Sequence, residues 1–454
     1  MLNLLLALAT LAPAAPAPAA QLAPTSQESE LDRLLEGLSP EEQLARRVTD
    51  EVLVAQRASP AVVYIETNVV RQRPSFWGMQ NENVQGAGSG MVIRDEGFIV
   101  TNYHVVRDAR TITVSFQEKI DPRQYRADVV SFVQEEDLAL LKIRGEEGQR
   151  FPTVPLGTSA DLMIGEKVIA IGNPLGHTHT VSVGIISGLH RDVNVSDGVN
   201  GALHFDDLIQ TDASINQGNS GGPLLNINGE MIGVNSAVNV RAENIGFAIP
   251  VDRVRQVLED QLLGSQMHRA WLGYEVGEND DLVVTAVTAG GPAEQVGLRV
   301  GDRIVAIGDT PLESFEQYRF ERVGLEPAEA VRMRVQRDGR ERNLTIPSWD
   351  RVTGMLFERL GLDAREVAIR SRNGVGYALQ VTQVYPGSPS EAVGLQAGDW
   401  LLAVRPEGAT GRRVPTRVDL AGAISGLRAQ TPLEIEIQRE RRTFRGKLIL
   451  GGAH

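Results

Sequence analysis

Gly218-Asn219-Ser220-Gly221-Gly222-Pro223 is the stretch on which the interpretation of this chain depends. It places one hydroxyl side chain among glycines. Glycine has no Cβ, so the backbone beside Ser220 can adopt unusual dihedral angles and approach another backbone closely. A serine on such a turn is a candidate nucleophile, because nearby backbone N–H groups can bind a developing oxyanion. Taken alone, the run also fits an ordinary surface loop.

Two further side chains could activate Ser220. A nucleophilic serine needs an imidazole to take its proton and a carboxylate to orient the imidazole. His104 follows the apolar run Phe98–Thr101, and Asp137 opens the run Asp137–Leu141. A single histidine at a strand end is usually structural, and a single aspartate there is usually a turn residue. The order His, Asp, Ser matches chymotrypsin-like double barrels and differs from α/β-hydrolases and subtilisins. We therefore predict a catalytic triad of His104, Asp137 and Ser220, with the N–H groups of Gly218 and Ser220 as the oxyanion hole.

The hydrophobic pattern from residue 61 to about 250 is typical of strands. Short runs rich in Val, Ile and Leu recur between Gly, Asn and Asp, which predicts an all-β barrel or sandwich. Asp95-Glu96-Gly97 is expected to form a tight turn, and Arg71–Gln85 and His190–Leu208 are expected to be loops. The predicted strand runs are Val62–Ile65, Met91–Ile93, Phe98–Thr101, Ile112–Phe116, Leu138–Ile143, Val168–Ile171, Val181–Ile186 and Met231–Val234.

Helical patterns flank this region. Ser39-Pro40-Glu41-Glu42 predicts a helix start, with a serine cap, proline in the first turn and glutamate three residues after the cap. Ser59-Pro60 is expected to end that helix. Val251–Leu263 has helical periodicity and is expected to link two domains.

An internal repeat occupies the C-terminal part of the chain. Val284–Ile307 aligns with Val381–Val404 at a constant offset of 97, and twelve of 24 positions are identical. Each unit is about 90–100 residues long, which is the size of a domain and too long for a solenoid repeat. The chain is therefore expected to end in two copies of one small β-rich module.

Composition and charge exclude several classes of function. The chain has 454 residues, a net charge of -13 and no cysteine. The acidic balance argues against a nucleic-acid surface, which needs clustered Lys and Arg. The absence of cysteine removes disulfides, thiol catalysis and thiolate metal sites. His177 and His179 have no carboxylate or cysteine beside them, so we expect no metal site and no cofactor.

The first twenty residues are typical of an export signal. Leu2–Leu11 is short and mostly apolar, and Ala17-Pro18-Ala19 fits a small-residue cleavage site, which places cleavage near Ala19-Ala20. No Lys or Arg lies near Met1. The alternative is a short uncleaved membrane anchor, but the run is too short to span a bilayer of roughly 30 Å. We expect a periplasmic protein.

The motifs, taken together, resemble the HtrA (DegP-like, or Do) family of periplasmic serine proteases. The resemblance covers the chain from about Ser59 to its end. It implies a mainly β fold: a chymotrypsin-like double β-barrel protease domain (59–255) and two PDZ domains (264–348 and 352–450), after a signal peptide (1–20) and a helical segment (21–58). The matching motifs are Gly88-Ser89-Gly90, Thr101–Val105, Asp137–Leu141, Gly172-Asn173-Pro174, Thr211-Asp212-Ala213, Gly218–Leu224 and Gly246–Pro250.

The resemblance also implies roles for individual residues. Ile215, Val238 and Ile245 match the S1 pocket, and their aliphatic side chains imply small or branched apolar P1 residues. Arg191, in the segment His190–Leu208, matches a sensor arginine that couples PDZ occupancy or trimer contacts to the active site. The loops that bind peptide carboxylates in PDZ domains match Leu272, Gly273 and Tyr274 in the first unit and Leu360, Gly361 and Leu362 in the second. An ordinary turn, and a second PDZ unit used for subunit contacts, are the alternatives.

The family further implies partners and an assembly. Unfolded polypeptides are the expected substrates, peptide C-termini the expected PDZ ligands, and homotrimers or multiples of trimers the expected assembly. Family trimers are usually held by aromatic residues near the mature N-terminus, yet the first aromatic residue here after the expected signal is Tyr64. Either aliphatic residues replace them or the oligomer contacts differ.

Three functions remain in competition. The first is an ATP-independent endopeptidase for protein quality control, since the chain has no phosphate-binding Gly-x-x-x-x-Gly-Lys-Ser/Thr run. The second is chiefly a peptide-binding chaperone. The third is a site-specific regulatory protease in envelope stress signalling, although such relatives usually keep a membrane anchor and one PDZ domain.

Overall fold

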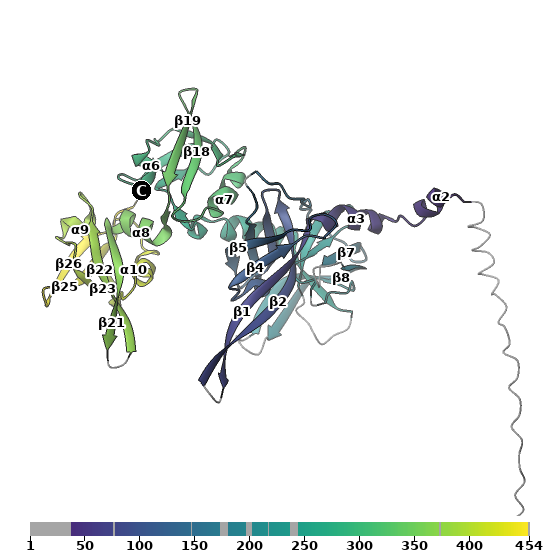
Figure 1. The fold of residues 1–454 in the computed structure, drawn as a ribbon, viewed down its shortest axis with the longest axis horizontal. Coiled ribbons are helices and arrows are strands. Elements are labelled where there is room, and N and C mark those ends of the chain that lie inside the picture. Colours follow the sequence, from purple (N-terminus) through teal and green to yellow (C-terminus); the bar gives the residue numbers. More distant parts are fainter. Residues whose placement is uncertain are drawn as a thin grey trace, which may run out of the picture. The chain divides into compact units, whose positions relative to one another are not determined.

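The computed structural model describes residues 38–75, 78–146, 148–172, 180–196, 202–216, 218–236, 244–371 and 374–452 (Figure 1). The chain divides into two compact units, Met1–Leu53 and Val54–His454. The predicted signal peptide and the pair His177 and His179 lie outside the described residues. Within the described part of the chain, no helix combines the length and the apolar character needed to cross a membrane.

The N-terminal helical segment begins as predicted but contains two helices. α2 (Pro40–Ala45) starts with a capping box, in which Ser39 caps the backbone of Glu42 and the Glu42 side chain caps the backbone of Ser39. After α2 the chain turns: the N–H of Val48 donates a hydrogen bond to the carbonyl oxygen of Ala45, three residues earlier. α3 (Asp50–Ala58) follows, and the turn Ser59–Ala61 ends it, as Ser59-Pro60 predicted.

Two closed barrels of six strands each follow, which confirms the predicted mainly β, double-barrel fold. The strand order is β1-β2-β3-β6-β5-β4 in the first and β10-β11-β12-β9-β8-β7 in the second. The first is built from β1 (Val62–Ser75), β2 (Gly78–Arg94), β3 (Phe98–Asn102), β4 (Thr111–Ser115), β5 (Gln124–Val133) and β6 (Leu138–Ile143); the second from β7 (Lys167–Gly172), β8 (Thr180–Ser196), β9 (Ala202–Thr211), β10 (Pro223–Leu225), β11 (Met231–Ser236) and β12 (Gly246–Pro250).

The barrels share a core. Apolar side chains fill each barrel, such as Ile99 in the first and Ile209 in the second. A third cluster joins strands of both barrels, where Val100 and Leu140 meet Ile169 and other buried residues. Each predicted strand run in this region lies within a strand, except that Phe116 falls one residue beyond β4. In most of them alternate or continuous apolar residues face these cores, but Val181, Val183 and Ile185 on β8 are exposed.

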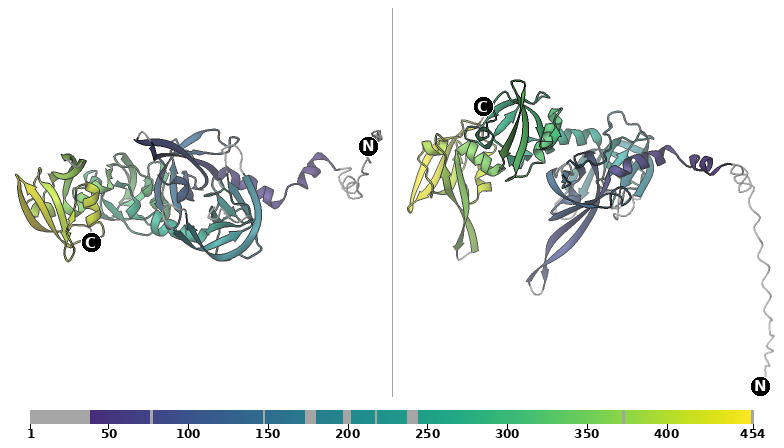
Figure 2. Two further views of the ribbon diagram at one scale, coloured as in Figure 1. Left: turned by 90° about the horizontal axis from the view of Figure 1, so that it is seen from below. Right: turned by 45° about the horizontal axis from the view of Figure 1, so that its top comes forward.

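Two expected loops are instead paired strands. Arg71–Gln85 lies mostly in a hairpin in which β1 and β2 pair from Val62 opposite Met91 to Ser75 opposite Gly78. Figures 1 and 2 show these two strands extending beyond the rest of the barrel. In the segment His190–Leu208, the described residues similarly lie in β8 and β9, which pair with each other. The run Arg71–Gln85 is mostly polar in sequence, so the local pattern did not predict its ladder of backbone pairs. In the β8–β9 segment, Phe205 and Leu208 are buried in the core that joins the two barrels, a contact with distant strands that the local pattern did not predict.

The predicted tight turn and linking helix are both present. Gly97 has a φ of 95° and donates its N–H to the carbonyl oxygen of Arg94. α5 (Val251–Val257) continues into the wider helical turn η2 (Leu258–Leu262). Together they span the predicted helix Val251–Leu263 except its last residue.

The C-terminal part contains two β-rich units. The first holds β14 (Tyr274–Val276) with β15 (Val284–Val287), β16 (Arg303–Ile307), β17 (Thr310–Pro311), β18 (Ala330–Arg337) and β19 (Arg340–Pro347), together with α6 (Pro292–Gln295), α7 (Phe315–Val323) and the pair β13 (Ala270–Trp271) and β20 (Trp349–Asp350). The second holds α8 (Arg351–Leu360), β21 (Leu362–Ser371), β22 (Gly374–Val384), α9 (Pro389–Ala392), β23 (Trp400–Pro406), β24 (Arg412–Arg413), α10 (Arg417–Ile424), β25 (Pro432–Arg439) and β26 (Arg442–Ile449).

The sequence repeat corresponds to a repeated ion pair. Asp302 accepts two hydrogen bonds from Arg337, at 2.5 and 2.6 Å, and its side chain is 1% exposed. At the repeat offset, Asp399 accepts two bonds of 2.7 Å from Arg439 and is equally buried. The same guanidinium in each unit also donates to a glycine carbonyl oxygen. The two units therefore share buried polar contacts as well as sequence.

Candidate active site

His104 and Asp137 are held together by three contacts. His104 lies in the short helix α4 (Tyr103–Val106), which begins where β3 ends. Its backbone N–H donates to Asp137 Oδ1 at 2.8 Å, and its Nδ1 lies 2.7 Å from Asp137 Oδ2. The N–H of Tyr103 donates to the carbonyl oxygen of Asp137 at 3.0 Å. The imidazole is thus oriented by a carboxylate at Nδ1, which leaves Nε2 to exchange a proton with a hydroxyl.

Asp137 is set in place by its backbone as well as by its side chain. Its φ of 50° lies in the left-handed region, which aspartate enters more readily than most residues. The carboxylate is 5% exposed, whereas the His104 side chain is 44% exposed. The Asn102 amide donates to the Asp137 carbonyl oxygen at 3.1 Å. A buried carboxylate therefore supports an imidazole that is partly exposed to solvent.

The turn that bears Ser220 contacts the first barrel. Ser89 N–H donates to the carbonyl oxygen of Ser220 at 2.9 Å, and Ser89 Oγ donates to the carbonyl oxygen of Gly218 at 2.5 Å. Gly221 has a φ of 81°, and a Cβ there would lie 2.2 Å from Thr101 Oγ1 and 3.2 Å from Asn102 N. Asn102 precedes His104 by two residues. The Ser220 turn therefore lies against the strand end that leads into His104.

The backbone of this turn is organised around Ser220. Gly218 has a φ of 109°, and both Gly218 and Ser220 are buried. The N–H of Gly221 donates to the carbonyl oxygen of Asn235 at 2.8 Å, and the N–H of Gly222 donates to that of Asn219 at 2.9 Å. These bonds hold the segment that contains the predicted oxyanion donors, Gly218 and Ser220.

Two of the three predicted S1 residues, Ile215 and Ile245, lie in segments that contact each other. Ile215 is half-buried, and a Cβ on Gly246 would lie 2.5 Å from Ile215 Cγ1, so the two segments are in contact. Ile245, next to Gly246, is 38% exposed. Val238 lies outside the described residues.

Arg191 lies on the β8–β9 hairpin, opposite Leu208. Its guanidinium covers Gly188, where a Cβ would lie 2.6 Å from Arg191 Nε. Its neighbour His190 lies 2.5 Å from an oxygen of Asp207, a pair that the sequence pattern missed because the partner is on the next strand. Both side chains are mostly exposed, at 84% and 58%, so this contact lies at the surface.

The two predicted carboxylate-binding loops have equivalent geometry. Gly273 has a φ of 77°, and its carbonyl oxygen accepts the N–H of Thr288 at 2.9 Å. Gly361 has a φ of 68°, and its carbonyl oxygen accepts the N–H of Tyr385 at the same distance. Gly361 also ends α8 as its left-handed cap. Leu272 and Tyr274 are buried in the first loop, and Leu360 and Leu362 are buried in the second.

Sequence reasoning missed the residues that support the site. Thr101 Oγ1 donates to the carbonyl oxygen of Ser89 at 2.7 Å, so Thr101, Ser89 and the Ser220 turn form one buried chain of contacts. The glycine-flanked serine of Gly88-Ser89-Gly90 was the available signal, but its partner is 129 residues away. Among the described residues, no cluster of three or more His, Cys, Asp or Glu is arranged to hold a metal ion.

Comparisons with known proteins identify the domains and the family. Residues 88–234 match the model of a trypsin-like peptidase domain, and residues 283–337 match that of a PDZ domain. A probable periplasmic serine endoprotease, DegP-like, from Chlamydia trachomatis is 33% identical over 411 residues, which cover 77% of this chain and 80% of the relative. A putative serine protease, HhoA, from Synechocystis is 34% identical over 342 residues, which cover 66% and 84%. This chain therefore belongs to the HtrA (DegP-like) family of serine endoproteases.

Proposed function

We propose that this chain is an exported, ATP-independent endopeptidase that degrades unfolded proteins, with Ser220 as nucleophile, His104 as general base and Asp137 as the group that orients His104. The observation that carries the proposal is the contact of 2.7 Å between His104 Nδ1 and Asp137 Oδ2, beside the turn that bears Ser220. The periplasmic DegP-like relatives support the exported location and the quality-control role. No cofactor takes part in the proposed reaction.

The proposed reaction has two halves. Ser220 Oγ attacks the scissile carbonyl carbon while His104 Nε2 takes the hydroxyl proton, and the oxyanion binds the N–H groups of Gly218 and Ser220. The tetrahedral species collapses, the C–N bond breaks, and His104 gives its proton to the leaving amine. Water then attacks the acyl-enzyme, again losing a proton to His104, and releases the acid and the Ser220 hydroxyl. Asp137 stays ionised and stabilises the imidazolium.

The proposed S1 pocket is formed by Ile215, Val238 and Ile245. Aliphatic walls favour apolar P1 side chains, because a cationic P1 residue would need a carboxylate at the base of the pocket. We expect cleavage after Val, Ala or Ile in a denatured protein such as casein, measured by mass spectrometry of the products. Predominant cleavage after Lys or Arg would contradict this pocket.

The PDZ units are proposed to bind peptide C-termini by strand addition, through Leu272–Tyr274 in the first and Leu360–Leu362 in the second. The match of residues 283–337 to a PDZ model supports the first, and the shared hydrogen-bond geometry of Gly273 and Gly361 supports the second. Arg191 is proposed to couple PDZ occupancy or trimer contacts to the active site. A homotrimer is the proposed assembly, as in the family.

One variant separates proteolysis from a holding function. Ser220→Ala removes the nucleophile and one hydroxyl only, so the fold is expected to stay intact. We expect casein turnover to fall at least ~10³-fold, with unchanged melting temperature. Persistent turnover by the purified variant would exclude Ser220 as nucleophile. Cleavage of a single native protein, with none of several unfolded ones, would favour the regulatory protease instead.

A further inference from the structure

Arg322 is a buried arginine that hydrogen-bonds the Tyr318 side chain but has no carboxylate partner among the described residues. It lies near the end of α7, and the residue is 4% exposed. Within the described part of the chain, its Nε and Nη1 atoms are buried and have no hydrogen-bond partner. A guanidinium stays charged in proteins, and a buried unpaired charge costs several kcal/mol. The position is therefore unfavourable unless an anion reaches it.

The protein groups around Arg322 compensate only a small part of this cost. The Arg322 Cζ atom lies 5.4 Å from the centre of the Tyr274 ring, and the Tyr274 and Tyr318 hydroxyls are 3.4 Å apart. A cation–π contact of this kind stabilises by about 0.5–2 kcal/mol, which is less than the cost of burial. Two neutral phenols cannot neutralise the charge.

A second neighbour shows that the surroundings are electropositive. Burial, together with the charges of Arg322, Arg351 and Arg319, lowers the pKa of His268 to about 2, so this imidazole is neutral. Its Nε2 is also buried and has no hydrogen-bond partner among the described residues. His268 and Arg322 can both donate hydrogen bonds to an anion, and further arginines lie close enough to influence His268.

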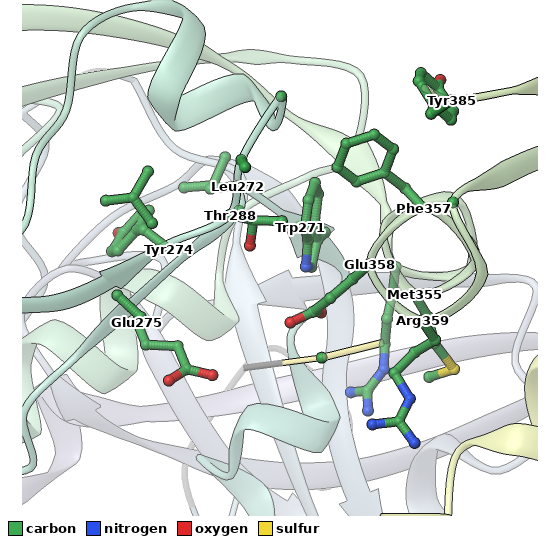
Figure 3. A pocket seen from close by; sticks show the side chains of 18 of the residues that line it. Trp271, Leu272, Tyr274, Glu275, Thr288, Met355, Phe357, Glu358, Arg359 and Tyr385 are labelled. Carbon is green, nitrogen blue, oxygen red and sulfur yellow. The ribbon is translucent and has the colours of Figure 1, made fainter. Parts of the chain in front are cut away.

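These residues line a cavity of about 800 Å³ beside the first predicted carboxylate-binding loop. Its walls include His268, Arg322 and Arg351 with Leu272 and Gly273 of that loop. Figure 3 shows Leu272 and Tyr274 on one side of Trp271 and Phe357 on the other. Glu275 and Glu358 also line the cavity, but neither accepts a hydrogen bond from Nε or Nη1 of Arg322. The predicted carboxylate-binding loop and Arg322, whose charge lacks a carboxylate partner in the described part of the chain, therefore line the same cavity.

We propose that the first PDZ unit selects peptides whose last residue is acidic, with the Asp or Glu side chain paired to Arg322. This inference rests on the proposed function of the loop Leu272–Tyr274, whose backbone N–H groups would take the main-chain carboxylate. Arg322 then supplies the second anion site. A guanidinium presents a planar fork of donors that matches a carboxylate, which makes Arg322 a specificity-determining residue.

The test uses the full chain with Ser220→Ala, so that peptides are not cut. Fluorescein-labelled peptides of one sequence end in Asp, Asn or Val, and a fourth is the Asp peptide with an amidated C-terminus. Fluorescence anisotropy gives their dissociation constants. We expect the Asp peptide to bind at least ~10-fold more tightly than the Asn or Val peptides. Equal or tighter binding of the Val peptide would overturn the inference.

Variants of Arg322 locate the preference. Arg322→Leu is expected to abolish the advantage of Asp over Asn, and Arg322→Lys, which keeps the charge but loses the fork, to retain part of it. Arg303→Leu, an exposed arginine on β16 of the same unit, is the matched control and should change nothing. Arg322→Leu should leave the melting temperature unchanged or raise it, because it removes an unpaired buried charge. A lower melting temperature would mean that Arg322 has a structural role, and would contradict the inference.

The outcomes separate this inference from the proposed loop function. If the amidated Asp peptide binds as tightly as the free acid, the loop is not a carboxylate site, whatever Arg322 does. If all free acids bind more tightly than the amide but Arg322→Leu does not alter the Asp preference, only the role of Arg322 fails. If no peptide binds, both proposals are wrong.

Discussion

The backbone N–H of Ser89 donates a hydrogen bond of 2.9 Å to the carbonyl oxygen of Ser220. This bond connects β2 of the first barrel to the turn that bears the proposed nucleophile in the second. Ser89 Oγ bonds the carbonyl oxygen of Gly218, and Thr101 Oγ1 bonds the carbonyl oxygen of Ser89. The proposed triad depends on this connection, because His104 and Asp137 belong to one barrel and Ser220 to the other.

The contact between the barrels predicts a steric requirement at Gly221. A Cβ there would lie 2.2 Å from Ser89 O and from Thr101 Oγ1, and the φ of 81° also disfavours a side chain. Gly221→Ala should displace the Ser220 turn, lower peptidase activity at least ~10²-fold and destabilise the fold by more than about 2 kcal/mol. Casein turnover and urea unfolding measure these effects.

Gly229→Ala is the matched control for Gly221→Ala. Gly229 has a nearly identical φ of 79°, but a Cβ there would contact only Val54, at 3.9 Å. The backbone strain alone should cost about 1–2 kcal/mol and leave the activity per folded molecule unchanged. Equal losses of activity in both variants would show that the close contact of Gly221 with Ser89 does not determine peptidase activity.

Asp137→Asn tests the orientation of His104. Asparagine fits the left-handed backbone at this position but donates an N–H where His104 Nδ1 needs an acceptor, so the wrong imidazole tautomer is favoured. We expect kcat to fall about 10³–10⁴-fold with little change in melting temperature. The exposed Asp161 supplies the control, since Asp161→Asn should keep full activity. A loss of less than ~10-fold in Asp137→Asn would argue against the triad.

The Asp302–Arg337 pair predicts a pH dependence of stability. Burial by itself raises the pKa of Asp302, but the bonds from Arg337 and the backbone N–H of Arg299 outweigh it and hold this pKa below its ordinary value. A carboxyl whose pKa is lowered by folding contributes stability above its unfolded pKa of about 4, and this is lost as the pH falls through the lowered value. Asp302→Asn should therefore destabilise the fold by about 3 kcal/mol at pH 7.

The same variant should also make the free energy of unfolding depend less on pH in the acidic range. Between about pH 5 and pH 3, unfolding free energies from urea titrations should fall less in Asp302→Asn than in the parent, with Ser220→Ala in both to prevent self-digestion. Asp309→Asn is the control, since Asp309 is 58% exposed and lies 3.5 Å from Arg332. An unchanged acid limb would mean that Asp302 is not a source of the acid sensitivity.

The sequence by itself determined those features of the fold that depend on neighbouring residues or on the order of motifs along the chain. Apolar runs such as Phe98–Thr101 predicted strands, since their side chains fill a barrel. The order of His104, Asp137 and Ser220 predicted the double barrel, and the offset of 97 between Asp302 and Asp399 predicted a repeated domain. The capping box at Ser39 was equally local, because its two partners are three residues apart.

Only the tertiary structure decided the features that depend on distant partners. The strands that pair Ser75 with Gly78 have no regular apolar pattern in their sequence, and their pairing joins residues by backbone ladders that such a pattern does not encode. The hydrogen bond from Ser89 to Gly218 joins residues 129 apart, and no periodicity encodes such a pair. Arg322 looked like any arginine on an amphipathic helix. The structure shows that Arg322 is buried beside Tyr274. Two of its nitrogens have no hydrogen-bond partner in the described part of the chain, which makes it a candidate anion site.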